Sequence, residues 1–169
     1  MTAHILITGG ARGIGAAAAN LLRNQGAKVV ALSSQDGDLS DANAAPEIWA
    51  RSLDQLDGHI DILINNAGIF DANPIEREQD AWLTCWNKTM QVNLTSAAQL
   101  SRLAILHWQS RGCAGRIINV ASRAAHRGDS PQHWHYAAAK AGMVAMTKTI
   151  ARAQAAEQIY AFAICPGFT

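Results

Sequence analysis

The amino-acid sequence predicts a three-layer α/β fold, in which a doubly wound parallel sheet carries helices on both faces. Short apolar runs of strand length alternate with longer stretches of helical periodicity along the 169 residues, as repeated β-α-β units do. A glycine-rich turn joins the first strand to the first helix, and polar or glycine-containing motifs follow several later strands. Since the carboxyl ends of parallel strands meet at one edge of a sheet, we expect these motifs to converge. The sequence contains no repeat or linker, so residues 1–169 are interpreted as a single domain.

The composition argues against several classes of function. Apolar residues make up 49% of the chain and charged residues 16%, with a formal net charge of +1, so no nucleic-acid partner is expected. No apolar run approaches the ~20 residues of a membrane span, and the N-terminus does not resemble a secretory signal. The scattered residues Cys85, Cys113 and Cys165 predict buried thiols in a reducing, cytoplasmic environment.

The start of the chain predicts a dinucleotide-binding unit. Residues 3–8 form an apolar strand, and a small-residue helix is expected from about residue 16 to residue 24. The glycines between them are spaced as Gly-x-x-x-Gly-x-Gly, which allows the backbone to approach a pyrophosphate at the helix N-terminus. A simple glycine-rich turn is the alternative, because the usual spacing is Gly-x-Gly-x-x-Gly. The predicted cofactor-binding residues of this turn are Gly9, Arg12, Gly13, Ile14 and Gly15.

The end of the second strand favours NADP(H) over NAD(H). Residues 28–33 form this strand, after a helix that Gly26 is predicted to cap. In a dinucleotide-binding unit, an acidic residue here binds the 2′-hydroxyl of NAD and repels the extra phosphate of NADP. This chain has Ser33 and Ser34 instead, with the cation of Arg12 available from the glycine turn. The hydroxyls, the cation and the missing repulsion together indicate NADP(H).

The rest of the chain continues the alternation of strands and helices. Asp41 is predicted to be the N-cap of the second helix. The predicted elements after it are a helix over 45–56, a strand over 60–64, one long helix over 80–110, a strand over 116–120, a loop over 121–135, a helix over 136–155 and a strand over 159–165.

Tyr136 and Lys140 are the main candidates for acid–base chemistry. Four positions apart in a predicted helix, they lie on one face and one turn apart. An ammonium group close to a phenol favours the phenolate and lowers the phenol pKa from its usual value of about 10. Such a tyrosine can donate or accept a proton near neutral pH, as reduction of a carbonyl or oxidation of an alcohol requires. Because the spacing arises by chance in many helices, its meaning depends on the motifs around it.

The ordered motifs resemble those of the short-chain dehydrogenase/reductase family. Residues 8–15 are similar to its cofactor loop, residues 65–68 to the motif after its fourth strand, and Pro166-Gly167 to its turn beside the nicotinamide. The resemblance extends over the whole chain. It implies a Rossmann-like fold and an NAD(P)(H)-dependent oxidoreductase that interconverts a carbonyl and a secondary alcohol.

The resemblance also assigns roles to four residues that match the family's Asn-Ser-Tyr-Lys tetrad. Tyr136 would be the general acid/base at the substrate oxygen, and Lys140 would lower its pKa and hold the nicotinamide ribose. Ser122 would hydrogen-bond the reacting oxygen, and Asn93 would bind a water that links Lys140 to solvent. Family members associate through the helices that carry Asn93 and Tyr136, which implies a homodimer or homotetramer. The implied cofactor contacts beyond the glycine turn and serines are Asp38, Leu39, Asn65, Ala67, Gly68, Tyr136, Lys140, Pro166 and Gly167.

Two departures from the family pattern lead to further expectations. Only residues 35–37 stand where the family has a helix and a strand, so we expect a shortened sheet edge and an altered adenine site at Asp38 and Leu39. The sequence also stops at Thr169, before the family's substrate-covering loop, last helices and final strand. One wall of the substrate pocket is therefore expected to be missing, and a long apolar sheet edge and a helix face are expected to be uncovered. The alternatives to an active enzyme are a non-catalytic nucleotide-binding remnant and a truncated form of a longer reductase.

The sequence leaves the substrate open between 3-oxoacyl thioesters and small polar ketones or polyols. The loop before Tyr136 offers His126, Arg127 and Trp134 as candidate substrate contacts, with a plain surface loop as the alternative for each. His133 and His135 alternate as a metal-binding pair can, but no third ligand is near them in sequence. We therefore expect no metal site.

Overall fold

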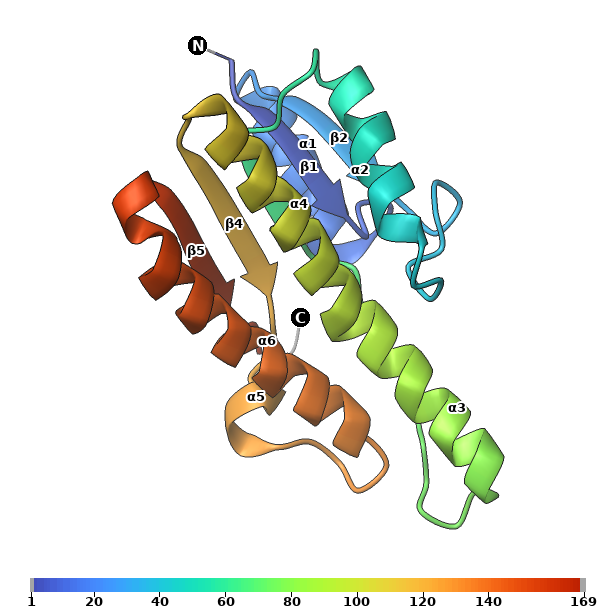
Figure 1. Ribbon diagram of the computed structural model, residues 1–169. Coiled ribbons are helices and arrows are strands. Elements are labelled where there is room, and N and C mark those ends of the chain that lie inside the picture. The colour runs from blue at the N-terminus through green and yellow to red at the C-terminus, as the bar shows by residue number, and fades with distance from the viewer. Residues whose placement is uncertain (1, 168–169) are drawn as a thin grey trace.

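The computed structural model of the protein describes residues 2–167 and confirms the parallel α/β sheet (Figure 1). One five-stranded sheet has the order β2-β1-β3-β4-β5, with every neighbouring pair parallel. Because β2 and β3 lie on opposite sides of β1, the winding direction reverses there, and a crevice is expected at the carboxyl ends of β1 and β3. The strands are β1 (His4–Thr8), β2 (Lys28–Leu32), β3 (Ile62–Asn65), β4 (Gly115–Val120) and β5 (Ile159–Ile164).

The helices cover the two faces of this sheet unequally. Helices α2, α4 and α6 pack on one face, and α1 packs on the other (Figure 1). A π turn (Gln91–Thr95) joins α3 to α4, and a 3-10 turn (Ala155–Glu157) follows α6. The helices are α1 (Gly13–Asn24), α2 (Ala44–Gln55), α3 (Gln79–Met90), α4 (Ser96–Arg111), α5 (Ala124–Arg127) and α6 (Trp134–Gln154).

The main core lies between the sheet and helices α2, α4 and α6. Leu6, Leu63 and Ile117 form one row across the sheet on this face, and each is fully buried. Trp108 of α4 is also fully buried, and its indole Nε1 donates a hydrogen bond of 2.5 Å to the backbone oxygen of Ile60. The bond satisfies the single polar atom of this large side chain. Trp108 therefore anchors α4 to the segment that enters β3.

The opposite face is covered at β1 but open at β5. The strand register places Tyr160, Phe162 and Ile164 on the α1 face, and their exposed fractions are 42%, 51% and 52%. Within the described part of the chain, no helix buries these three side chains. Since β5 is an edge strand, the expected uncovered apolar edge lies here, and the exposure also extends over one face of the strand.

Three local predictions from the sequence are wrong. The helix expected over 80–110 is divided by the π turn, because the apolar pattern continues through it and gives no sign of the extra residue. Helix α5 forms inside the predicted loop, since its four residues are too few to show periodicity. The N-cap of α2 is Asn43, while Asp41 accepts a hydrogen bond of 2.8 Å from the Asn43 backbone N–H.

The cysteines differ from the prediction of buried thiols. Cys85 and Cys165 are partly exposed, Cys113 is exposed, and all three are free. Cys113 follows Gly112, whose φ of 59° ends α4 and turns the chain at the surface. The apolar neighbours that suggested burial therefore do not shield this thiol. Across residues 2–167, no helix has both the length and the apolar character that a bilayer crossing needs.

Replacing Trp108 by phenylalanine should lower the free energy of unfolding by about 2 kcal/mol or more. The variant loses a buried hydrogen bond, leaves the Ile60 carbonyl unpaired and opens a gap in the core. Urea unfolding followed by circular dichroism measures the change. Trp134→Phe is the matched control, because Trp134 is 55% exposed and should change stability by less than about 0.5 kcal/mol. Equal effects of the two substitutions would contradict the anchoring role.

Candidate active site

Side-chain hydrogen bonds join the carboxyl ends of β1 and β3. The hydroxyl oxygen of Thr8 accepts hydrogen bonds from the backbone N–H groups of Asn66 and Ala67, both at 3.1 Å. In return, the Asn66 amide donates to the backbone oxygens of Thr8 at 3.0 Å and Gly9 at 2.9 Å. These bonds fix the glycine turn against the segment after β3, at the point where the winding of the sheet reverses.

The glycine turn has a shape that fits a pyrophosphate group. Gly9 has φ of 66°, and a Cβ at Gly9 or Gly15 would collide with backbone or with Asn66, so the turn packs tightly. Gly13, with φ of 56°, has open space at the position of a Cβ. Arg12 is the exposed N-cap of α1 and makes no side-chain hydrogen bond to the first helical turn. The amide groups of that turn are therefore not capped by the Arg12 side chain, and uncapped helix N-termini are suited to anionic ligands.

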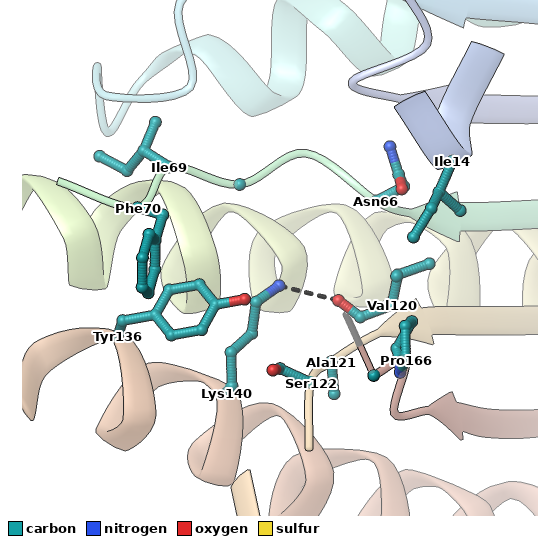
Figure 2. Close-up of a pocket in the computed structure, with 12 residues that line it drawn as sticks. Ile14, Asn66, Ile69, Phe70, Val120, Ala121, Ser122, Tyr136, Lys140 and Pro166 are labelled. Atoms are coloured by element: carbon teal, nitrogen blue, oxygen red, sulfur yellow. Dashed lines mark hydrogen bonds between the residues drawn. The ribbon is translucent and has the colours of Figure 1, made fainter. Parts of the chain in front are cut away.

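A cavity of about 210 Å³ lies beside this turn (Figure 2). It is formed where the ends of β1, β3, β4 and β5 meet the first turns of α6. The residues that line it are Ile14, Asn66, Gly68, Ile69, Phe70, Val120, Ala121, Ser122, Tyr136, Lys140, Pro166 and Gly167. Seven of the sequence-predicted site residues are among them, namely Ile14, Gly68, Ser122, Tyr136, Lys140, Pro166 and Gly167.

Lys140 is buried at the base of the cavity. The residue is only 3% exposed, and its ammonium donates a hydrogen bond of 2.8 Å to the backbone oxygen of Val120 (Figure 2). Burial lowers the pKa of Lys140 to about 8, because surroundings of low polarity disfavour the charged form, while Cys165 opposes the shift. Lys140 is therefore mostly protonated at pH 7 and loses its proton when the pH rises above about 8.

Tyr136 and Lys140 project from the same side of α6 into the cavity (Figure 2). The Lys140 ammonium lies 5.9 Å from the centre of the Tyr136 ring. Phe70 holds this ring edge to face, with 4.7 Å between ring centres and an angle of 84°. Phe70 is in turn stacked on His133, with 3.8 Å between ring centres. The Tyr136 ring therefore packs against an aromatic ring on one side, and Lys140 lies one helical turn further along α6.

Ser122 follows β4 and also faces the cavity. Its hydroxyl oxygen accepts a hydrogen bond of 3.1 Å from the backbone N–H of Ala124. The hydroxyl hydrogen is not used by that bond and can be donated to an oxygen atom in the cavity.

Asn93 lies in the π turn, behind the cavity wall. Its side-chain oxygen accepts from the Ile69 backbone N–H at 2.8 Å, and its side-chain nitrogen donates to the Ile69 oxygen at 2.9 Å. A Cβ at Gly68 would lie 3.4 Å from the Asn93 oxygen and 3.6 Å from the Lys140 ammonium. Asn93, Gly68 and Lys140 are therefore close neighbours, and the side chain of Asn93 holds the wall segment in place.

The two asparagines after Ile64 point in different directions. Asn65 is turned into the protein interior, where its amide donates to Asn119 at 2.8 Å and Ser101 at 3.2 Å. Asn66, which the sequence did not single out, lines the cavity instead. Ala67 lies directly beneath Gly9, so it supports the glycine turn. Alternation along β3 could have indicated that only one of the asparagines faces the crevice.

The end of β2 carries a carboxylate that the sequence argument did not consider. Asp36 accepts hydrogen bonds from both the backbone N–H and the hydroxyl of Ser33, each 2.8 Å long. These bonds lower the pKa of Asp36, so the group is ionised at neutral pH. Ser34 and Asp38 are exposed, whereas Leu39 packs against the main core.

The three candidate substrate contacts lie outside the cavity lining. His126 and Arg127 are exposed on α5, and the His126 ring nitrogen lies 3.5 Å from the sulfur of Cys165. Trp134 is 55% exposed at the start of α6. The lining residues that sequence reasoning missed are Asn66, Ile69, Phe70, Val120 and Ala121. Val120 ends a predicted strand, and Ala121 and Asn66 lie within two positions of one, which is the signal that could have found them. Ile69 and Phe70 lie further along the segment after β3 and carry no such signal.

Comparisons with known proteins agree with this geometry. A family model for short chain dehydrogenases matches residues 3–48 and 32–169. The 3-oxoacyl-[acyl-carrier-protein] reductase FabG of Vibrio harveyi is 35% identical over 181 residues, which cover 96% of this chain and 72% of the relative. Nodulation protein G of Rhizobium sp. (strain N33) is also 35% identical, over an alignment that covers 96% of this chain and 71% of that protein. The solved structure of a 4-hydroxyisoleucine dehydrogenase complexed with NADH aligns with a TM-score of 0.85 at 28% identity, covering 96% of this chain and 74% of that one.

The chain thus spans about seven-tenths of the length of these relatives, and the match includes every motif of the crevice. The sheet order, the glycine turn and the meeting of Ser122, Tyr136 and Lys140 agree with the match. The chain therefore belongs to the short-chain dehydrogenase family, and it is an oxidoreductase that uses a nicotinamide cofactor.

Proposed function

We propose that the chain interconverts a carbonyl and a secondary alcohol, with Tyr136 giving or taking the proton at the substrate oxygen. The observation that carries the proposal is the position of Tyr136 and Lys140 in one cavity, next to a turn that fits a pyrophosphate. A bound nicotinamide supplies or accepts the hydride. Gly68, Pro166 and Gly167 line the same cavity and are the residues proposed to hold the nicotinamide end.

Lys140 is proposed to make the tyrosine a better acid–base group. Its ammonium is desolvated and lies 5.9 Å from the phenol ring, and a nearby cation in such a site favours the phenolate. With a pKa of about 8, about nine-tenths of Lys140 carries a proton at pH 7. The charge that tunes Tyr136 is thus present at neutral pH.

Ser122 and Asn93 are proposed to act on either side of this pair. Ser122 has a free hydroxyl hydrogen because its oxygen accepts from Ala124, so it can donate to the reacting oxygen together with Tyr136. The side-chain oxygen and nitrogen of Asn93 are both hydrogen-bonded to the backbone of Ile69. We therefore propose that a water linking Lys140 to solvent would bind Asn93 through an atom that these two bonds do not use.

The preference for NADP(H) is proposed to depend on two opposing charges. Arg12 at the start of α1 and the hydroxyls at the end of β2 favour a 2′-phosphate, as argued from the sequence. Asp36 opposes it, because its ionised carboxyl is held at Ser33, where the adenosine ribose is expected. We propose that Arg12 and the serines make NADP(H) bind more tightly than NAD(H), and that the charge of Asp36 reduces this difference in affinity.

The substrate class that we propose first is 3-oxoacyl thioesters. Several relatives between 34% and 37% identical are named as 3-oxoacyl-[acyl-carrier-protein] reductases. The cavity is open, and Phe70, 54% exposed, offers an apolar surface at its mouth. His126, Arg127 and Trp134 would contact only the parts of a long substrate that extend beyond the cavity. Small polar ketones remain the second class, since the solved relative is a 4-hydroxyisoleucine dehydrogenase.

We further propose that the chain forms a homodimer or homotetramer through the helices that carry Asn93 and Tyr136. Leu83 of α3 and Leu106 of α4 are 40% and 46% exposed, and burying such side chains against a second copy would favour association.

A nucleotide-binding protein without turnover is the second candidate function. The observations that favour it are the small cavity of about 210 Å³ and the uncovered side chains of β5. A substrate held on too few sides would not be fixed for reaction. Tight binding of NADPH or NADH without oxidation by any ketone or thioester would support this alternative.

Tyr136→Phe should reduce kcat at least 100-fold, because it removes the proton that general acid catalysis supplies. NADPH oxidation with a 3-oxoacyl thioester at pH 7 and saturating NADPH measures the rate, and fluorescence titration of NADPH confirms that the cofactor is saturating in both proteins. Tyr160→Phe is the matched control, since Tyr160 lies on the uncovered face of β5. If wild-type protein is active and Tyr136→Phe keeps its kcat, Tyr136 is not the acid–base group.

The burial of Lys140 predicts a distinctive pH dependence of stability. Its folded pKa of about 8 lies below the usual lysine value of 10.5, so the unfolded chain binds more protons between these two pH values. The contribution of Lys140 to the free energy of unfolding therefore rises as pH increases through this window. Relative to Lys140→Met, wild type should gain up to about 3 kcal/mol from pH 8 to pH 10.5 in urea unfolding.

Lys148→Met provides the control for this experiment, because Lys148 lies on the exposed side of the same helix. Its stability difference from wild type should stay nearly constant over the same pH range. If the difference in unfolding free energy between wild type and Lys140→Met also stays constant with pH, burial does not lower the pKa of Lys140.

Asp36→Asn should shift cofactor choice towards NADPH. Removal of one negative charge near the 2′-phosphate is expected to lower the ratio of Kd(NADPH) to Kd(NADH) roughly fivefold or more. Arg12→Gln should raise the same ratio. Asp54→Asn, an exposed carboxyl on α2, should leave it unchanged. An unchanged ratio in Asp36→Asn would show that this carboxylate does not face the ribose.

A further inference from the structure

Two histidines and an aspartate meet at the end of the sheet opposite the catalytic crevice. His4 begins β1, and His59 and Asp61 lie in the segment that enters β3. The Oδ2 atom of Asp61 is 3.6 Å from His4 Nδ1 and 3.8 Å from His59 Nε2. One ligand atom of each residue lies within 4.8 Å of the others. We propose that these three residues bind a divalent transition-metal ion of the zinc type.

His4 has the hydrogen-bonding pattern of a metal ligand. Its side chain is 12% exposed, and its Nδ1 atom is buried without a hydrogen-bond partner. The other ring nitrogen, Nε2, lies 3.4 Å from the Asp57 carboxylate. A proton on Nε2 that is donated to Asp57 leaves the lone pair of Nδ1 directed towards Asp61. Histidine ligands commonly have their second nitrogen held by a carboxylate in this way, which fixes the ring and strengthens the ligand.

The distances fit tetrahedral coordination after a small adjustment. Zinc binds imidazole nitrogen at about 2.0–2.1 Å and carboxylate oxygen at about 2.0–2.2 Å, which places neighbouring ligand atoms roughly 3.3–3.5 Å apart. The observed 3.6 Å and 3.8 Å require movements of a few tenths of an ångström, and the two histidine nitrogens, which lie within 4.8 Å of each other, must approach by at most about 1.4 Å. The side chains of His59 and Asp61 are 35% and 40% exposed, so an ion and a water as fourth ligand can reach the site from solvent.

The charges around the cluster favour a cation. Asp57 and Asp61 supply two carboxylates, and the ammonium of Lys28 is paired with Asp57 at 2.7 Å. With neutral histidines, the group carries one net negative charge. The Asp61 carboxylate is also fixed by the backbone N–H of His4, which donates to Oδ2 at 2.7 Å. The site is therefore partly arranged before an ion arrives, which reduces the entropy lost on binding.

A bound ion would fasten β1 to the connection between α2 and β3. His4 and Asp61 are 57 positions apart in sequence, so the expectation of no metal site, based on neighbouring residues, could not include them. A metal that binds only the folded chain stabilises it in proportion to occupancy. The cluster shares no residue with the cavity lining, so this inference does not depend on the proposed reaction.

The test is titration of chelator-treated full-length protein with Zn²⁺ by calorimetry and with Co²⁺ by visible absorption. We expect one ion per chain with a Kd on the order of micromolar or tighter. His59→Gln and Asp61→Asn should each weaken binding at least tenfold, since they remove a direct ligand. Saturating Zn²⁺ should raise Tm by about 5 °C in wild type and much less in His59→Gln. Circular dichroism checks that each variant is folded.

His126→Gln is the control, because His126 and Cys165 form a rival nitrogen–sulfur pair at 3.5 Å. Unchanged binding in this variant supports the proposed site. Three results would overturn it: no binding with Kd below about 100 μM, equal affinity in wild type and His59→Gln, or a Co²⁺ spectrum with thiolate charge-transfer bands. The last result would assign the ion to a cysteine such as Cys85, which lies 3.7 Å from His135.

Discussion

The carboxyl ends of parallel strands leave backbone groups that no neighbouring strand can pair, and they must be satisfied where the sheet stops. In this protein the backbone N–H groups of Gly10 and Ala121 close the ends of β2 and β5, and side chains of the crevice close β1 and β4. Asn66 donates to the Thr8 and Gly9 oxygens, and Lys140 donates to the Val120 oxygen. Asn66 and Lys140 therefore both line the site and hydrogen-bond the ends of strands, so a substitution at either residue would affect the structure of the sheet as well as the site.

This dual use has a consequence for Lys140. A buried ammonium is held at β4 by one hydrogen bond to a neutral carbonyl, and no described carboxylate pairs with it. The resulting desolvation destabilises the charged form and brings its pKa to about 8. The burial that places the ammonium 5.9 Å from the centre of the Tyr136 ring therefore also raises the free-energy cost of keeping Lys140 charged.

Local patterns in the sequence were sufficient for the fold and for the meeting of Ser122, Tyr136 and Lys140. Strand and helix periodicities are local, and topology then brings the strand ends together. The features that sequence reasoning missed depend on distance or orientation. Asn65 and Asn66 differ only in the direction of their side chains, Asp36 folds back on Ser33 through hydrogen bonds, and the π turn does not interrupt the apolar pattern. Only the two asparagines leave a periodic signal, the alternation of side chains along β3, whereas the contact of Asp36 and the π turn leave none.

The groups proposed to transfer the proton are held independently of the uncovered face of β5. Every hydrogen bond that positions Tyr136's neighbours, Ser122, Asn93 and Lys140, ends on a residue between β1 and α6. The uncovered face of β5 contributes none of them. Under the proposed function, a change at Phe162 or Ile164 would therefore leave the hydrogen bonds of the proton-transfer groups intact. Relatives that share the crevice but act on different substrates are consistent with such a division.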